Sequence, residues 1–125
     1  MQIIDPPQKP DKVVAEALIQ VGHPDIPDRR STAIWVGHPY QDESGRWFCE
    51  CYVEGFSQYK IPGSSSFEAL TGALCAVRMQ LETLIGVGNE LFIPELPELV
   101  GKEKVMEKLF GLYGYVHSSF LKKSD

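Results

Sequence analysis

Two cysteines that lie two residues apart are the first residues whose types and spacing could support chemistry. Cys49 and Cys51 stand in a segment rich in β-prone residues, so both thiols are expected on one face of a strand, where they could bind a soft metal ion. Trp47 and Val53 fall on the same face, and no second pair of ligands follows at the spacing of a zinc finger. The pattern favours two buried thiols, and we expect neither a metal nor a cofactor.

His38 is the best candidate for acid–base chemistry. Asp42 and Glu43 follow it closely, and a carboxylate can orient an imidazole. His38 precedes a proline, however, in a segment typical of a turn, where a histidine is usually exposed to solvent. We expect no enzymatic activity, with a small metal-binding or hydrolytic enzyme based on His38 and nearby carboxylates or cysteines as an alternative.

The serines at positions 64–66 have a structural use. Ser65 can accept a hydrogen bond from the backbone of Glu68, whose side chain can reach back to the Ser65 amide, which is a capping box at a helix start. Nothing marks these serines as activated nucleophiles. The glycines are not spaced as in a dinucleotide-binding or phosphate-binding loop.

Composition narrows the class of protein further. The chain has 125 residues, which suits one domain, and its 12 Lys and Arg against 17 Asp and Glu give a net charge of −5. That balance disfavours nucleic acid and favours a basic protein partner. Three cysteines make no disulfide framework, no apolar run is long enough for a membrane span, and the acidic, proline-rich start does not resemble a signal peptide. We therefore expect a cytoplasmic protein that binds no membrane.

Hydrophobic periodicity predicts an α+β fold. Residues 1–12 are expected to form an extended N-terminal arm, and residues 13–125 a single domain. The domain is predicted to hold a mainly antiparallel sheet of about four strands, with one long helix packed across a face and a second, C-terminal helix. The expected strands cover residues 13–21, 31–38, 46–55 and 56–62, with an extended segment at 89–96, and the expected helices cover 65–85 and 99–113. For 13–21 a short helix is the alternative.

A glycine lies inside the predicted long helix. Gly72 costs about 1 kcal/mol of helix propensity relative to alanine. We therefore predict that the sheet or a second helix approaches the helix backbone closely there.

The alternation along residues 46–55 predicts a binding surface. If the thiol-bearing side faces the long helix, the residues between the thiols must face away, together with an aromatic residue of the preceding strand. Aromatic rings beside carboxylates are typical of a protein-binding surface. The predicted binding residues are Trp35, Phe48, Glu50, Tyr52 and Glu54.

Two alternatives concern this same face. The second helix could cover the aromatic residues, with Lys104 and Lys108 pairing Glu50 and Glu54, since an unpaired buried carboxylate is costly. The face could instead mediate self-association into a homodimer of purely structural function.

A series of short motifs resembles a group of small bacterial proteins that contain a domain of unknown function. These are Val36-Gly37-His38-Pro39, Trp47-Phe48-Cys49 and Ser66-Phe67-Glu68-Ala69-Leu70, in that order. In that group a strand with Trp and Cys precedes a helix that opens with Phe or Gln and Ala-Leu, and the resemblance covers residues 13–96. It implies no catalytic residues. Small acidic bacterial proteins of this kind resemble immunity proteins or antitoxins, which implies a basic partner.

Overall fold

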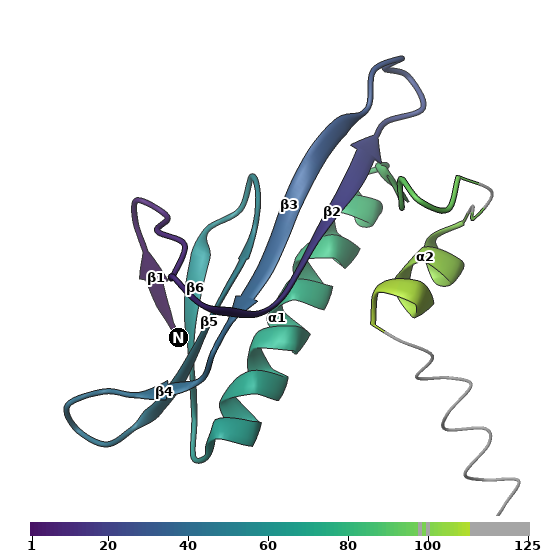
Figure 1. The fold of residues 1–125 in the computed structure, drawn as a ribbon. Helices are drawn as coiled ribbons and strands as arrows, with labels where there is room; N and C mark the ends of the chain where they lie inside the picture. Colours follow the sequence, from purple (N-terminus) through teal and green to yellow (C-terminus); the bar gives the residue numbers. More distant parts are fainter. Residues whose placement is uncertain (98, 100, 111–125) are drawn as a thin grey trace, which may run out of the picture.

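The computed structural model describes residues 1–97, 99 and 101–110, and within them the fold is α+β (Figure 1). An antiparallel sheet has one long helix behind it and a shorter helix to the side. The strands are β1 (Gln2–Ile4), β2 (Val13–Gly22), β3 (Arg30–Gly37), β4 (Tyr40–Gln41), β5 (Trp47–Val53), β6 (Gln58–Gly63) and β7 (Glu90–Phe92), and the helices are α1 (Ser66–Gly86) and α2 (Lys102–Leu109).

The sheet has seven strands, so the prediction of about four strands was wrong. Six strands follow the order β1-β6-β5-β3-β2-β7, and β4 pairs with β5. β1 and β4 were not predicted, whereas β7 lies within the segment 89–96 that was expected to be extended, and all three are only two or three residues long. Segments this short carry no measurable periodicity, and they become strands because a longer strand offers them hydrogen bonds.

Residues 13–22 form a strand, so the short-helix alternative was wrong. β2 pairs with β3 in antiparallel register, with Ala17 opposite Ile34 and Leu18 opposite Ala33. Ile19 is buried while Leu18 is 55% exposed, as expected for a strand with one face on the core.

The hydrophobic core lies between the sheet and α1. Cys49, Cys51 and Val53 of β5 are fully buried and belong to one apolar cluster with the α1 residues Ala69, Ala73, Val77, Leu81 and Leu84. Because side chains alternate along a strand, this arrangement sends the intervening β5 residues to the opposite face, which we call the outer face.

The start of α1 uses the predicted cap. The Ser65 hydroxyl accepts a hydrogen bond from the backbone N–H of Glu68 at 3.1 Å. The second half of the predicted capping box differs, because the Glu68 carboxylate accepts a hydrogen bond from the Ser64 hydroxyl at 2.6 Å instead of returning to the Ser65 amide.

The second helix lies on the same side of the sheet as α1. Its Val105 is fully buried in the core cluster shared with α1, and Phe110 lies 5.9 Å from the Arg78 guanidinium of α1. The alternative in which this helix covers the outer face was therefore wrong. Of the predicted range 99–113, residues 100 and 111–113 lie outside the described part.

The helix and sheet backbones approach closely at two glycines. A Cβ atom on Gly72 would lie 2.9 Å from a methyl carbon of Ile61 in β6, which confirms the close approach predicted there. A Cβ atom on Gly63 would lie 2.8 Å from the Cα atom of Ala69, so β6 ends directly against the first turn of α1. Side-chain atoms can move aside, but backbone atoms of a helix cannot, so the constraint at Gly63 is the stricter one.

Gly63→Ala is expected to lower the free energy of unfolding by about 2–3 kcal/mol, because the added methyl group forces α1 away from β6. The control is Gly86→Ala at the end of α1, where nothing lies within 4 Å of the position that the added methyl group would take. That variant should be neutral or more stable by up to about 1 kcal/mol. Urea unfolding of both variants checks the prediction, and equal midpoints would contradict it.

Burial also controls thiol reactivity. It raises the pKa of Cys49 to about 11 and that of Cys51 to about 12, so both remain protonated thiols at pH 8, whereas Cys75 is exposed. A disulfide reagent at pH 8 is expected to modify Cys75 rapidly and the other two only after unfolding, since the thiolate is the reactive form. Counting released chromophore before and after adding guanidinium checks this, and rapid reaction of all three native thiols would refute it.

Candidate functional site

The structure places the five predicted binding residues on the outer face or at its border. Trp35 is directly opposite Tyr52 across β3 and β5, and Phe48 and Glu50 lie further along β5. Their exposure differs. Trp35 and Phe48 are each only 5% exposed, Glu50 and Tyr52 are half-buried, and Glu54 is exposed. Trp35 and Phe48 thus offer almost no accessible area in this conformation.

The N-terminal arm covers part of the outer face. In Figure 1 it leaves β1 and crosses in front of the sheet to reach β2. The backbone N–H of Gln8 donates to the Gln58 side chain at 2.6 Å, and the Lys9 ammonium lies 2.8 Å from the Glu16 carboxylate. Pro10 lies against Gly37, where its ring carbon would be 3.3 Å from an added Cβ atom. The arm therefore spans the sheet from β6 to β2.

Beneath the arm, both carboxylate oxygens of Glu50 accept hydrogen bonds from neighbouring side chains. One Glu50 oxygen accepts a hydrogen bond from the Tyr40 hydroxyl at 2.8 Å, and the other accepts one from the Gln58 amide at 2.7 Å. The same Gln58 amide donates to the Gln8 carbonyl at 3.0 Å. Partial burial, followed by the hydrogen bond to Glu50 and the charge of Glu50, raises the pKa of Tyr40 far above its usual range. Tyr40 is thus a permanent donor, and Glu50 has a structural role in this conformation.

Aromatic contacts fill the space around this network. The Trp35 and Tyr52 rings are 5.8 Å apart, and the Tyr40 and Phe48 rings are 6.3 Å apart. The Lys60 ammonium lies 4.0 Å from the centre of the Phe48 ring, a cation–π contact. Trp35 and Phe48 therefore form a second, smaller apolar layer on the outer face.

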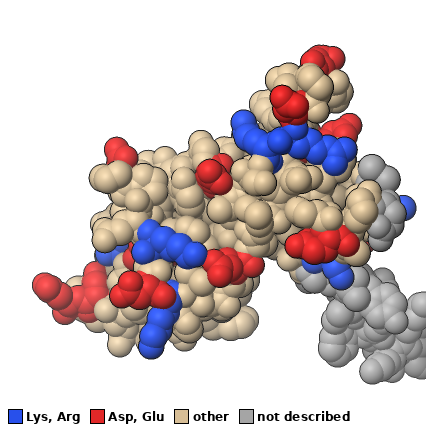
Figure 2. Space-filling view, turned by 45° about the horizontal axis from the view of Figure 1, so that its top comes forward, with Lys and Arg blue, Asp and Glu red and all other residues tan. Residues whose placement is uncertain are grey.

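The part of the outer face that the arm does not cover forms what we call the uncovered patch: Leu18, Ala33, Tyr52 and Glu54. Leu18 is opposite Ala33, and the backbone N–H of Ala33 donates to the Glu54 carboxylate at 2.9 Å, so the patch crosses three strands. Figure 2 shows a broad uncharged area with acidic and basic side chains toward its borders. The patch thus combines an exposed leucine, a half-buried tyrosine and an accessible carboxylate.

His38 is exposed and belongs to no metal-binding group: within the described part of the chain, no three His, Cys, Asp or Glu side chains are close enough together to hold an ion. No described helix is long and apolar enough to cross a membrane.

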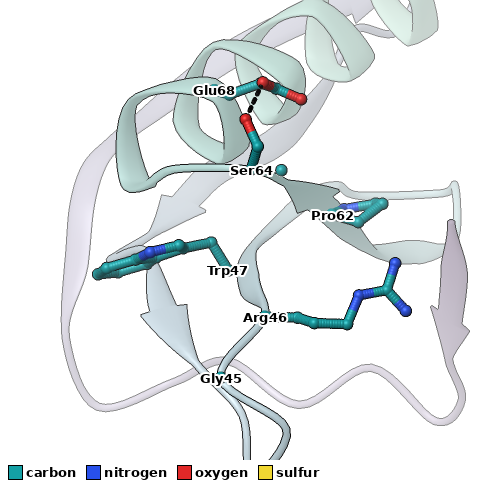
Figure 3. Close-up of a pocket in the computed structure, with 7 residues that line it drawn as sticks. Gly45, Arg46, Trp47, Pro62, Ser64 and Glu68 are labelled. Atoms are coloured by element: carbon teal, nitrogen blue, oxygen red, sulfur yellow. Dashed lines mark hydrogen bonds between the residues drawn. The ribbon is translucent and has the colours of Figure 1, made fainter.

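A shallow hollow lies at the junction of the β4–β5 turn and the start of α1 (Figure 3). Arg46, Trp47 and Glu68 line it, and the Glu68 carboxylate is occupied by the hydrogen bond from Ser64. The hollow is open to solvent, and the Ser64–Glu68 hydrogen bond that lines it links the end of β6 to the first turn of α1.

Two residues of this face were missed by the sequence reasoning. The exposure of Leu18 could have been predicted, because residues alternate along a strand and Leu18 therefore lies on the side opposite the buried Ile19. Gln58 is fully buried and connects the arm to Glu50, but an isolated glutamine has no pattern that predicts burial.

Comparison with known proteins adds no family: no family model, no curated protein and no solved structure matches this chain.

Gln58→Ala is expected to destabilise the protein by about 1–3 kcal/mol, because it removes a fully buried side chain that hydrogen-bonds the Gln8 backbone and the Glu50 carboxylate. It should also loosen the arm, so that trypsin cleaves after Lys12 faster than in the wild type. Gln41→Ala, at an exposed glutamine in β4, is the control. Equal stability and equal cleavage rates in the two variants would show that the network does not hold the arm.

Proposed function

We propose that this protein is a small binding module that recognises a basic protein partner through the uncovered patch, with Tyr52 and Glu54 as its central contacts. The observation that supports the proposal is the exposure of Leu18 on a sheet face that no described helix covers. A leucine exposed to 55% on the same sheet face as a half-buried tyrosine is typical of a surface that is buried in a complex.

Charge supports the choice of partner. The chain carries a net charge of −5, and Glu54 borders the patch without an ion-pair partner among the described residues. A cationic partner would approach such a surface faster than a neutral one, and the acceleration would fall with added salt.

Among proteins that bind basic partners, the proposal extends by analogy to an immunity or antitoxin function in a bacterial cytoplasm. In that function, carboxylates of the small acidic protein occupy the cationic surface of a toxin. Of the five residues predicted from the sequence, Tyr52 and Glu54 would contact the partner directly. Trp35 would pack against the Tyr52 ring and keep it in place. Phe48 and Glu50 would have a structural role in the other half of the face.

The test is affinity purification of partners from the native host with tagged wild-type protein and two charge-reversal variants. Glu54→Lys lies in the patch, whereas the control Glu43→Lys makes the same charge change in the β4–β5 turn. We expect a basic protein to co-purify with the wild type and the control, and its recovery with Glu54→Lys to fall at least about tenfold, which corresponds to about 1.4 kcal/mol.

Measured association rates provide the second criterion. The wild-type rate should decrease as salt is raised, and Glu54→Lys should have a slower rate at low salt with a weaker salt dependence. Absence of any specific partner, or equal loss in both variants, would overturn the proposal.

A further inference from the structure

Most of one edge of β2 has no strand beside it in the described part of the chain. β2 pairs with β3 from Val13 to Val21, but with β7 only at Gln20, Val21 and Gly22. Between these limits the strand is accessible: Val14 is 45% exposed and Leu18 is 55% exposed. Natural proteins usually protect such an edge with lysine or proline, and residues 13–19 contain neither.

The backbone hydrogen-bonding groups of this edge point outward. The carbonyl of Ala33 accepts from the Glu54 N–H at 2.9 Å and the N–H of Ala33 donates to the Glu54 carboxylate, so both groups of Ala33 point toward β5. Leu18 is opposite Ala33, so its own N–H and C=O point away from β3 and toward the free edge. The backbone N–H and C=O of Glu16, two residues earlier, point in the same direction. Those of Gln20, two residues later, also face this edge, and there β7 pairs with β2.

The side chains along this edge have a pattern that is symmetric about Glu16. On each side of Glu16 stand one alanine and then two larger apolar residues, in the order Val13, Val14, Ala15, Glu16, Ala17, Leu18, Ile19. An antiparallel pair of identical strands centred on Glu16 would set Val14 opposite Leu18 and Ala15 opposite Ala17. Each exposed apolar side chain would then meet an apolar side chain of the other copy.

We propose that two copies of this chain associate through antiparallel pairing of their β2 edges, with Glu16 on the two-fold axis. Such an interface is isologous, because the same strand serves both partners, and it joins the two sheets into one. The proposal shares the Leu18 side chain with the uncovered patch, but it rests on the free backbone edge of β2 and does not depend on the proposed function.

Two features make this association weak. The two Glu16 carboxylates would be close together, although each has a Lys9 ammonium 2.8 Å away that reduces the repulsion. The register of β2 also shifts between Val13 and Ala15, and this bulge bends the strand and limits the length of the new ladder. We therefore expect dimers only at high protein concentration, with Kd on the order of 100 µM.

Cross-linking at the axis tests the geometry. In the two-fold arrangement only residue 16 is opposite itself, with a Cα separation of about 5.5 Å that a disulfide can span. Glu16→Cys is made together with Cys75→Ser, which removes the exposed native thiol, and is treated with a mild copper–phenanthroline oxidant. We expect covalent dimer to form at least about ten times faster than with Glu43→Cys in the same background, because the paired strands hold the thiols together.

Sedimentation of protein that lacks the exposed thiol tests the affinity. The fraction of dimer in Cys75→Ser protein should rise between about 10 µM and about 1 mM. Glu16→Gln should lower Kd about fivefold by removing the paired charges, and Leu18→Lys should abolish the dimer, whereas Leu74→Lys on α1 should have no effect. A monomer at every concentration, or equal cross-linking at positions 16 and 43, would overturn the proposal, as would a dimer that Leu74→Lys disrupts and Leu18→Lys does not.

Discussion

The close contact between the end of β6 and the first turn of α1 is the constraint on which the rest of the structure depends. Gly63 lies against the backbone of Ala69, and Gly72 lies against Ile61, so small residues hold the helix directly on the sheet. The face of β5 toward α1 carries Cys49, Cys51 and Val53, and Trp47, the first residue of the strand, packs against the same core cluster. Phe48 and Tyr52, the other two aromatic residues of β5, lie on the outer face because side chains alternate along a strand.

The outer face is covered by a single segment of chain instead of a helix. A face with one arm across it can bury only part of its apolar residues, and the Gln8–Gln58–Glu50 contacts determine which part. Trp35 and Phe48 are buried in this face, Trp35 against Tyr52 and Phe48 against Tyr40 and Lys60. Leu18 and Glu54 lie in the other half, where no described segment competes with a partner.

The two proposed surfaces share this incomplete coverage. The uncovered patch is a face without a second layer, and the β2 edge is a strand without a neighbour along most of its length in the described part of the chain, since β7 is only three residues long. A dimer through β2 would place both patches on the same side of one continuous sheet, because a two-fold axis perpendicular to a sheet preserves its faces. One molecule of a multivalent partner could then contact two patches, which raises avidity without a new contact.

The sequence by itself determined the features that depend on local periodicity. The alternation at residues 46–55 predicted which side of β5 would carry the thiols, and the serine run before a 3.6-residue period predicted where α1 begins, with Ser65 as its cap. Gly72 predicted a close approach because its cost in helix propensity requires a tertiary reason. These signals lie within one element, so the residues that carry them are neighbours in the chain.

Only the tertiary structure decided the features that join distant segments. The sequence did not predict that Gln8 meets Gln58, that Lys9 reaches Glu16, or that a three-residue strand at the N-terminus pairs with β6. It also could not choose the side of the sheet on which α2 lies, because an amphipathic helix fits any apolar surface of suitable size. The exposure of each predicted binding residue depends on these long-range contacts, and a contact between residues fifty positions apart leaves no periodic trace in the sequence.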